Sequence, residues 1–298
     1  MTFDAKQFFI DYGIDSASEG NKHTRQGWVQ VPCPFCSGNP GYHLGFNLAH
    51  DYFNCWRCGF HPITKVIRTF AVCSWHDAKQ LKKQYRSRSK LEQTPEQKRI
   101  KQKKLKLPSN MGKLGSRDFA YMERRGFDPY HTMGEWGIVS SGPTGGYKHR
   151  ILIPIHYNNV MVSYQGRDTT GKSRLRYKAC KKSDELIHHQ SILYGLDKAK
   201  KGDTCILVEG VTDVWRMGPG SVSCFGIATQ TSQITLLAEN FTRVFVMFDD
   251  DPQARREADK IGSNLSVLGV EVEICVIDGD PAELPQATAD EYRAELFK

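Results

Sequence analysis

The stretch FVMFDDDPQARREADKIG, residues Phe245 to Gly262, places three consecutive aspartates directly after a run of apolar residues. The apolar run is typical of a buried strand, and the residues that follow the aspartates have the composition of a helix. Three adjacent carboxylates repel one another unless a cation neutralises them or they point in different directions. In an extended segment Asp249 and Asp251 point to one side and Asp250 to the other, which indicates that Asp250 is a helix cap or a solvent-exposed residue.

The same alternation of strand and helix runs through the C-terminal part of the chain. Apolar runs at 205–208, 221–226, 243–248 and 271–277 predict strands, and the segments near 211–217, 230–240 and 253–269 have helical patterns. Continuous apolar strands that alternate with helices predict an α/β fold with a parallel sheet covered on both faces. In such sheets ligands bind beyond the carboxyl ends of the strands.

Acidic residues follow three of these four predicted strands. We expect them to converge on one rim of the sheet, with Asp213 one helical turn beyond Glu209 and directed back toward it. Hard divalent ions such as Mg²⁺ bind oxygen ligands and often coordinate substrate phosphates as well as protein carboxylates. A single acid at a strand end is usually a turn or cap residue, but the recurrence of acids at three strand ends favours a metal site. The residues of this predicted rim are Glu209, Asp213, Asp249, Asp251, Asp278 and Asp280.

Near the N-terminus, the segment 31–62 reads VPCPFCSGNPGYHLGFNLAHDYFNCWRCGFHP. It contains two Cys-x-x-Cys pairs, Cys33 with Cys36 and Cys55 with Cys58, separated by 18 residues. Two such knuckles complete a tetrahedral Zn²⁺ site, and four protein ligands leave no open position, so the zinc is expected to be structural. A redox role for the pairs is the alternative, although no thioredoxin-like βαβ pattern surrounds them. One of the nearby histidines, His43, His50 or His61, could replace a thiolate.

Between the two knuckles, the segments 42–48 and 51–55 are expected to form short strands of a small zinc ribbon. Most of the aromatic rings in so small a fold are expected to be core. Exposed rings beside cations can stack on unpaired bases, and Trp56 with Arg57 are the candidates for reading a template.

The length of 298 residues suits two or three modules. We expect a zinc-binding domain at 1–76, a basic linker at 77–107, the first part of a catalytic core at 108–200 and a parallel-sheet subdomain at 201–298. The net charge is +8, and residues 79–106 hold twelve basic and two acidic residues. This excess favours a polyanionic partner such as nucleic acid, with a solvated helical linker as the alternative.

The sequence does not point to a membrane or to secretion. No apolar run approaches the roughly 20 residues of a membrane span, and the N-terminus lacks the basic start of a signal peptide. The odd number of cysteines, nine, argues against a complete disulfide framework. We therefore expect a cytoplasmic protein without a membrane partner.

The acidic motifs LVEGVTD, FDDD and DGDPAEL resemble the TOPRIM module of bacterial and phage primases and topoisomerases. Upstream, RDFAYMERRGFDP, HRILIPIHYNNVMVSYQGRD and SILYGLDKAKKGDTCILVEG resemble the first part of the primase catalytic core. The cysteine ribbon resembles the primase zinc-binding domain, and the three parts follow in the family's order. Cys36 stands where many cellular primases have histidine, and no helicase motif is present. The whole chain resembles a stand-alone, bacteriophage-type DNA primase.

This resemblance implies synthesis of short RNA primers from NTPs on single-stranded DNA, by two-metal-ion phosphoryl transfer in DNA replication. It implies catalytic roles for Glu209, Asp249 and Asp251, one structural Zn²⁺, and two or more Mg²⁺ ions that Mn²⁺ could replace. His189 stands at the basic position before the LYG motif. The implied partners are a replicative helicase, with a single-strand-binding protein and a DNA polymerase, in the cytoplasm of a bacterial host. The basic residues implied for nucleotide or template binding are Arg150, Arg167, Lys172, Arg174, Arg176 and Lys178.

Two other classes of protein combine similar parts. A recombination mediator joins a four-cysteine zinc motif to a TOPRIM fold and binds DNA without catalysis, but it needs no complete acidic set. A TOPRIM nuclease or topoisomerase fragment would use the acids, but a topoisomerase also needs a tyrosine on a further domain. The full acidic set favours the primase.

Overall fold

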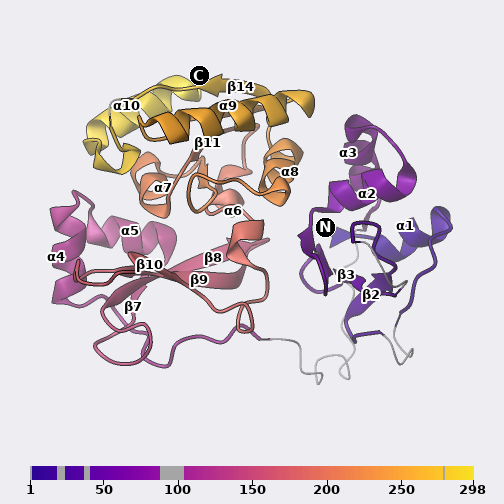
Figure 1. The fold of residues 1–298 in the computed structure, drawn as a ribbon, viewed down its shortest axis with the longest axis horizontal. Helices are drawn as coiled ribbons and strands as arrows, with labels where there is room; N and C mark the ends of the chain where they lie inside the picture. The colour runs from indigo at the N-terminus through magenta and orange to yellow at the C-terminus, as the bar shows by residue number, and fades with distance from the viewer. Residues whose placement is uncertain (1, 19–23, 37–40, 88–103, 278) are drawn as a thin grey trace. The chain divides into compact units, whose positions relative to one another are not determined.

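A computed structural model describes residues 2–18, 24–36, 41–87, 104–277 and 279–298 (Figure 1). The predicted metal ligand Asp278 and the middle of the basic segment, 88–103, lie outside the described residues. The chain divides into two compact units, residues 1–103 and 104–298, and each is considered by itself.

The N-terminal unit contains an antiparallel sheet with strand order β2-β3-β4-β5 and a small pair, β1 with β6. The β3–β4 hairpin lies where the sequence predicted it, with Leu44 opposite Cys55. The elements of this unit are β1 (Thr2–Phe3), α1 (Ala5–Asp11), β2 (Trp28–Val31), β3 (Leu44–Asn47), β4 (Tyr52–Cys55), β5 (Gly59–His61), α2 (Ile63–Ala71), α3 (Trp75–Gln84) and β6 (Arg86–Ser87).

A phenylalanine-rich core holds this unit together. Phe8 and Phe9 of α1 are fully buried against Phe46 and Phe53 of the sheet, and Ile67 of α2 joins the same cluster. Full burial of each such side chain is worth about 1.5–3 kcal/mol. The ribbon therefore rests on more apolar surface than the cysteine segment alone offers, because α1 and α2 enlarge its core.

The first part of the predicted basic linker belongs to this unit. The Ser74 side chain caps α3 by accepting the amide of Asp77 at 3.1 Å. After the helix, Tyr85 packs edge-on to Phe8 at 5.4 Å, and its hydroxyl donates to Asp11 at 2.7 Å. Residues 77–87 are thus ordered by contacts with α1 and β1.

The second unit contains an antiparallel and a parallel sheet, and Figure 1 shows α4 and α5 beside the antiparallel one. Its elements are α4 (Ser116–Arg124), α5 (Pro129–Trp136), β7 (Val139–Ser140), β8 (Arg150–Tyr157), β9 (Val160–Asp168), β10 (Tyr177–Ala179), the 3₁₀ helix η2 (His189–Ser191), α6 (Leu196–Ala199), β11 (Thr204–Val208), α7 (Val211–Met217), β12 (Ser221–Ser223), α8 (Thr231–Asn240), β13 (Arg243–Val246), α9 (Pro252–Val267), β14 (Glu271–Ile274), the 3₁₀ helix η3 (Pro281–Glu283) and α10 (Gln286–Leu296).

The antiparallel sheet has strand order β10-β9-β8-β7 and is built around the β8–β9 hairpin. Its two-residue turn is Asn158-Asn159, with φ values of 52° and 61°. Asparagine tolerates this left-handed conformation, which a tight hairpin of right-twisted strands requires. The long β9 strand ends at Asp168 and carries Gln165 and Arg167 to the site described below.

The parallel sheet has strand order β12-β11-β13-β14, and every neighbouring pair is parallel, as the sequence predicted. The chain crosses the sheet in one direction from β11 to β12, and in the opposite direction from β12 to β13 and from β13 to β14. Right-handed crossovers therefore put α7 on one face of the sheet and α8 and α9 on the other. The connections that leave β11 and β13 therefore diverge. The crevice between them, where Glu209 and Asp249 follow their strands, is the expected ligand site of such a sheet.

None of the helices among the described residues has the length and apolar character that crossing a membrane requires.

Candidate functional site

Backbone amides fix two of the predicted acids at the end of β11. Glu209 directly follows this strand, and its Oε1 accepts the backbone N–H of Asp249 at 3.0 Å. Asp213 lies in the first turn of α7, where its Oδ2 accepts the N–H of Gly210 at 2.8 Å. Only 4% of the surface of Asp213 is exposed, and this capping contact gives its buried carboxylate a hydrogen-bond donor.

Three carboxylates come together beside these contacts. Asp213, Asp249 and Asp280 each offer an oxygen, and these oxygens all lie within 4.8 Å of one another. Asp280 is held at the start of η3, where its Oδ1 accepts the N–H of Ala282 at 2.8 Å. Oxygens bound to one octahedral Mg²⁺ are about 3 to 4.2 Å apart, so this spacing fits a divalent ion.

The acids of this rim raise one another's pKa values. Burial, reinforced by Asp280 and Asp249, raises the pKa of Asp213 to about 7. Burial also raises the pKa of Glu209 to about 7, and burial together with Asp280 and Asp251 raises that of Asp249 to about 6. A bound cation would stabilise the ionised form of these carboxylates, because it would neutralise their charge.

The other two aspartates after β13 have separate partners. Asp251 is the N-cap of α9, and its Oδ1 accepts the amides of Gln253 at 2.8 Å and Ala254 at 3.0 Å. Asp251 is not in the group of three close carboxylates, although its charge acts on Asp249. Asp250 is exposed and pairs with Arg255. The cap is therefore Asp251, and Asp250 is the solvent-exposed residue.

A pocket of about 320 Å³ opens over the acids. Its lining includes the acids Glu209, Asp213, Asp249 and Asp280. Its lining also includes the guanidinium-bearing residues Arg125, Arg167 and Arg176, which form the cationic side of the pocket. The pocket thus places anionic and cationic groups around one space. Such an arrangement suits a ligand that bears both phosphates and metal ions.

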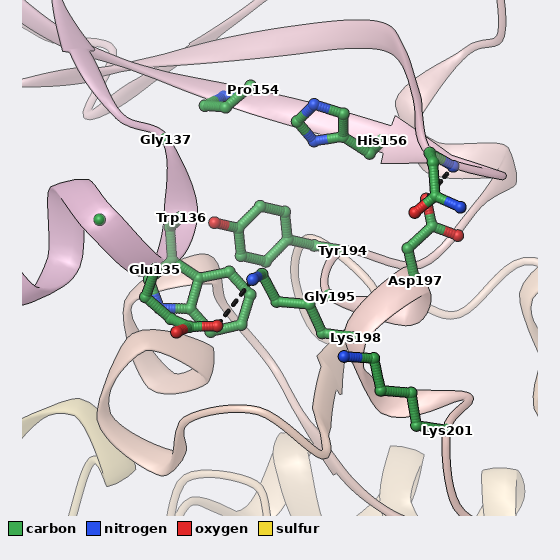
Figure 2. A pocket seen from close by; sticks show the side chains of 12 residues that line it. Glu135, Trp136, Gly137, Pro154, His156, Tyr194, Gly195, Asp197, Lys198 and Lys201 are labelled. Atoms are coloured by element: carbon green, nitrogen blue, oxygen red, sulfur yellow. Dashed lines mark hydrogen bonds and ion pairs between the residues drawn. The ribbon is translucent and has the colours of Figure 1, made fainter.

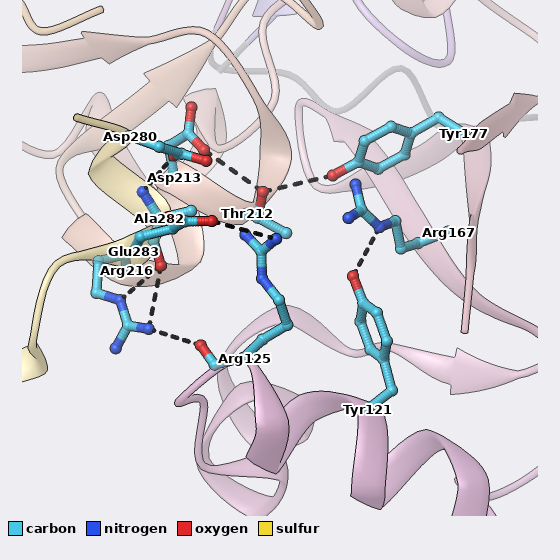
Figure 3. A network of polar contacts seen from close by, with 10 residues as sticks. All are labelled: Tyr121, Arg125, Arg167, Tyr177, Thr212, Asp213, Arg216, Asp280, Ala282 and Glu283. Carbon is cyan, nitrogen blue, oxygen red and sulfur yellow. Dashed lines mark hydrogen bonds and ion pairs between the residues drawn. The ribbon is translucent and has the colours of Figure 1, made fainter. Parts of the chain in front are cut away.

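Arg167 is held by two tyrosines on the cationic side, as Figure 3 shows. Its Nε donates to the Tyr121 hydroxyl at 2.7 Å, and its guanidinium lies 4.6 Å from the centre of the Tyr177 ring. The Tyr177 hydroxyl is 3.5 Å from Thr212, the residue before Asp213. Tyr121 and Tyr177 therefore fix Arg167 beside the acidic rim.

The other predicted basic residues lie elsewhere, except Arg176, which lines the pocket. Arg150 is buried and donates to the Gly166 carbonyl at 2.9 Å and the Ser173 hydroxyl at 2.7 Å, so its donors are used inside the fold. Lys172 and Arg174 are exposed on the segment between β9 and β10. Lys178 donates to the Gly146 carbonyl at 2.6 Å.

Arg216, which the sequence did not single out, joins three segments behind the rim (Figure 3). Its guanidinium is buried against the Phe127 ring, 4.4 Å from the ring centre. It donates to the carbonyls of Arg125 and Gly126 at 3.0 Å and of Ala282 at 3.2 Å. These bonds tie the turn after α4 and the η3 segment that carries Asp280 to α7.

The four predicted zinc ligands gather in the N-terminal unit. The Sγ atoms of Cys33 and Cys58 are 3.6 Å apart, and those of Cys36 and Cys55 are 3.8 Å apart. Sulfurs bound to one tetrahedral Zn²⁺ at about 2.3 Å lie about 3.8 Å from one another. These two pairs join the two knuckles, so the cluster is consistent with a structural zinc ion. Cys33, Cys36 and Cys55 lie with His43 within 4.8 Å of one another, whereas Cys58 groups with Cys33 and His61.

Backbone amides and two histidines complete the surroundings of the sulfurs. Cys55 Sγ accepts the N–H groups of Arg57 at 3.3 Å and Cys58 at 3.4 Å, as a thiolate ligand would. His43 Nδ1 lies 3.3 Å from Cys55 Sγ, and His61 Nε2 lies 3.0 Å from Cys58 Sγ. Either imidazole can hydrogen-bond a thiolate or exchange with it as a ligand, so the alternative of a histidine ligand concerns these two residues.

Most aromatic rings of the ribbon are core, as expected, while Trp56 and Arg57 lie at its surface. Phe46, Tyr52, Phe53 and Phe60 are buried, Trp56 is half-buried and Arg57 is exposed. Trp56 packs on Trp28 with ring centres 5.2 Å apart and lies over Gly45, where a Cβ would come within 2.4 Å of its ring. A glycine at position 45 is thus what allows Trp56 to lie flat on the sheet.

A larger pocket of about 470 Å³ lies away from the acids, between α5, β8 and α6 (Figure 2). Trp136, Tyr194 and Pro154 form its apolar part. Its Lys198 pairs with Glu135 at 2.7 Å, and its Asp197 accepts the amides of the Asn158-Asn159 turn. Its charges are mostly paired, and it holds no group of close carboxylates, so the smaller pocket is the better candidate site.

Solved structures resemble the chain, whereas no family model and no curated protein matches it by sequence. The zinc-binding and RNA polymerase domains of Aquifex aeolicus primase align with 99% of this chain and 85% of their own, with a TM-score of 0.51 and 18% identity. The chain has the fold of a DnaG-type primase. The alignment spans both units, so the DnaG-type fold accounts for the cysteine cluster and for the parallel sheet.

Two catalytic-core structures agree with this DnaG-type fold. A DnaG primase catalytic domain bound to single-stranded DNA matches 60% of this chain and 71% of its own, with a TM-score of 0.53 and 20% identity. The catalytic core of E. coli primase matches 60% and 72%, with a TM-score of 0.51 and 20% identity. At these identities the likeness establishes the fold.

Proposed function

We propose that this chain is a DNA primase that makes short RNA primers from NTPs on single-stranded DNA. The observation that carries the proposal is the group of carboxylates Asp213, Asp249 and Asp280 at the crevice of the parallel sheet, in a pocket that arginine side chains also line. A nucleoside triphosphate with divalent ions carries both kinds of complementary charge. Two ions in such a site, when bound, supply activation of a hydroxyl nucleophile and neutralisation of the leaving pyrophosphate.

The acids have separate tasks in this proposal. Asp213, Asp249 and Asp280 all line the pocket and would hold the ions together. Glu209 is bound to the amide of Asp249 through one oxygen, which leaves the other for a ligand or a proton. Its pKa of about 7, raised by burial, suits a group that accepts the proton of the attacking 3′-hydroxyl near neutral pH. Asp251 would act through its charge and by starting α9.

The cationic side of the pocket would hold the triphosphate. Arg167 is fixed by Tyr121 and Tyr177, so a guanidinium there loses little conformational entropy when phosphate binds. Arg176 and Arg125 line the same space. Lys172 and Arg174 are exposed next to it in sequence and are proposed contacts for the template backbone. Arg150, which is buried and donates to the Gly166 carbonyl and the Ser173 hydroxyl, and Lys178, which donates to the Gly146 carbonyl, would act by supporting these segments.

The N-terminal unit is proposed to read the template. Trp56 is half-buried with the guanidinium of Arg25 5.4 Å from its ring centre, and Arg57 beside it is exposed; aromatic rings beside cations suit unpaired bases. The single-stranded DNA in a structure of similar fold supports DNA as the template. The proposed organisation has a ribbon module that includes the ordered residues 77–87, a linker formed by the rest of the basic segment, and a two-part core. A replicative helicase, a single-strand-binding protein and a DNA polymerase in a bacterial cytoplasm remain the proposed surroundings.

The test is primer synthesis by the purified chain. Single-stranded DNA of mixed sequence, radiolabelled NTPs and Mg²⁺ should yield short RNA products. Asp249→Asn should abolish them while DNA binding persists, because a neutral amide is a poor ligand for Mg²⁺. Asp250→Asn is the matched control, since Asp250 is the neighbouring aspartate and pairs with Arg255 outside the pocket.

Each rival predicts a different result in this assay. DNA cleavage by the wild-type chain that Asp249→Asn removes would assign the same acids to a nuclease. DNA binding without RNA synthesis under any divalent ion would favour a recombination mediator. Either result would overturn the primase proposal.

A further inference from the structure

Outside the two sites already described, a third group of side chains of metal-ligand type lies at the start of η2 in the second unit. Glu185, His188 and His189 each offer a ligand atom, and these atoms all lie within 4.8 Å of one another. The group belongs neither to the cysteine cluster nor to the acidic pocket. Glu185 and His189 are buried, with 2% and 6% of their surfaces exposed.

An unpartnered nitrogen inside this group points to a missing ligand. His189 Nδ1 is buried and has no hydrogen-bond partner among the described residues. It lies 3.7 Å from Glu185 Oε2, which is too long for a hydrogen bond. Leaving a buried polar atom without a partner costs about 1–3 kcal/mol, so such an atom needs a reason.

The carboxylate of Glu185 is oriented as metal-binding carboxylates are. Ser163 of β9 donates its hydroxyl to Oε2 at 2.7 Å, and the backbone N–H of His189 approaches the same oxygen at 3.4 Å. These donors fix the side chain through atoms other than the two imidazole nitrogens of the group. Such outer contacts orient metal ligands and strengthen their affinity.

We propose that Glu185, His188 and His189 bind a Zn²⁺ ion and form a second zinc site, distinct from that of the ribbon. Two imidazoles and one carboxylate are a donor set that Zn²⁺ takes readily. Three protein ligands leave a coordination position for water or for an oxygen of a bound anion. The His189 ring packs edge-on to Phe225, with ring centres 5.2 Å apart, and Phe225 lines the acidic pocket. The ion would therefore add positive charge behind that pocket wall.

Entry of the ion requires one small movement. Ligand atoms on a tetrahedral Zn²⁺ are about 3.4 Å apart, close to the distance between His189 and Glu185. His188 Nδ1 is only 2.5 Å from Glu185 Oε1, a contact that needs a shared proton. The ion would replace this proton, and the His188 side chain, which is 30% exposed, has room to move outward.

The test is zinc stoichiometry of the full chain, measured by elemental analysis after dialysis against a weak chelator and excess Mg²⁺. The wild type should retain two equivalents of Zn²⁺. His189→Gln, Glu185→Gln and His188→Asn should each retain one, and Cys36→Ser should remove the other. Ser163→Ala should keep the ligands but weaken the affinity about 10-fold, the size of typical outer-contact effects.

Two other outcomes would overturn the proposal of a second zinc site and would leave the proposed primer synthesis unaffected. A wild type with one equivalent, lost in Cys36→Ser and unchanged in His189→Gln, would show that only the ribbon binds zinc. A second equivalent that persists in His189→Gln but disappears in Asp249→Asn would assign the ion to the acidic pocket. Thermal unfolding of His188→Asn, whose residue is partly exposed, separates loss of metal from loss of fold.

Discussion

The backbone N–H of Asp249 donates a 3.0 Å hydrogen bond to Oε1 of Glu209, which joins the ends of β13 and β11. This bond brings together two carboxylates that are 40 residues apart in the sequence. It stabilises the charged form of Glu209, yet burial still raises the pKa of that residue to about 7. The rim is thus assembled at an electrostatic cost that a bound divalent ion would remove.

We expect Asp249→Asn to raise the thermal stability of the metal-free chain. The substitution removes one of the charges that repel Asp280 and Asp251, and its effect should be on the order of 1 kcal/mol, or a few degrees in Tm. The stabilisation by added Mg²⁺ should be lost at the same time. Differential scanning calorimetry with and without Mg²⁺ measures both. Asp250→Asn, which only breaks the pair with Arg255, should give neither effect.

The metal-free chain should become less stable as pH rises from about 4 to about 7. Glu209, Asp213 and Asp249 have pKa values of about 7, 7 and 6, raised by burial from ordinary values near 4. The folded state therefore holds more protons in this window, and its stability falls as they are lost. Mg²⁺ affinity should rise over the same range.

The contribution of Glu209 to this trend can be isolated by comparison with Glu209→Gln. The difference in unfolding free energy, wild type minus variant, should decline from acidic to neutral pH in denaturant titrations without metal. A difference that is flat, or that increases with pH, would contradict the pKa assignment.

Removal of the ribbon zinc should unfold the sheet β2–β5 and leave the second unit folded. Two pairs of sulfurs, one from each knuckle, have the spacing of ligands on one zinc ion, and without the ion no bond would hold the knuckles together. Hydrogen exchange after treatment with a strong chelator should show loss of protection around Leu44 and Cys55, with protection kept in β11 and β13. Equal loss in both units, or no change around Cys55, would be inconsistent with a structural zinc in the ribbon.

Arg216→Met should destabilise the second unit by about 2–4 kcal/mol. The substitution leaves the buried carbonyls of Arg125, Gly126 and Ala282 without their donor. Because Ala282 adjoins Asp280, Mg²⁺ affinity should fall as well. Urea unfolding and Mg²⁺ titration measure the two effects. Arg256→Met, at an exposed position of α9, is the matched control and should change stability by less than about 0.5 kcal/mol.

The sequence predicted the parallel sheet because each of its strands carries its own signal. Continuous apolar runs followed by an acid mark β11 and β13, and a short segment closed by Gly226 marks β12, without any knowledge of their neighbours. The proximity of Glu209 and Asp249 then follows from strand direction, since parallel strands end at one edge. Asp280 lies beyond the end of β14 and is placed by its position as the N-cap of η3. The cysteine spacing predicted the ribbon for the same local reason.

Features that depend on contacts between distant segments could not be predicted from local sequence patterns. Arg216 acquires its role only when the turn after α4 and η3 meet α7, segments separated by 66 to 91 residues. Tyr121 and Tyr177 acquire theirs by enclosing Arg167. The N-cap of α9 is Asp251 because the strand ends at Val246, before the aspartates, so the alternation of an extended segment does not apply to them.

The most direct test of the acidic rim is anomalous diffraction from crystals of the chain soaked in Mn²⁺ with a nucleoside triphosphate. The proposed function predicts at least one Mn²⁺ ion about 2.1 Å from an oxygen of Asp249, with Asp280 as a further ligand and phosphate oxygens on its open side. Nucleotide bound in the pocket with no ion at Asp249, or Mn²⁺ found only at other sites, would contradict it.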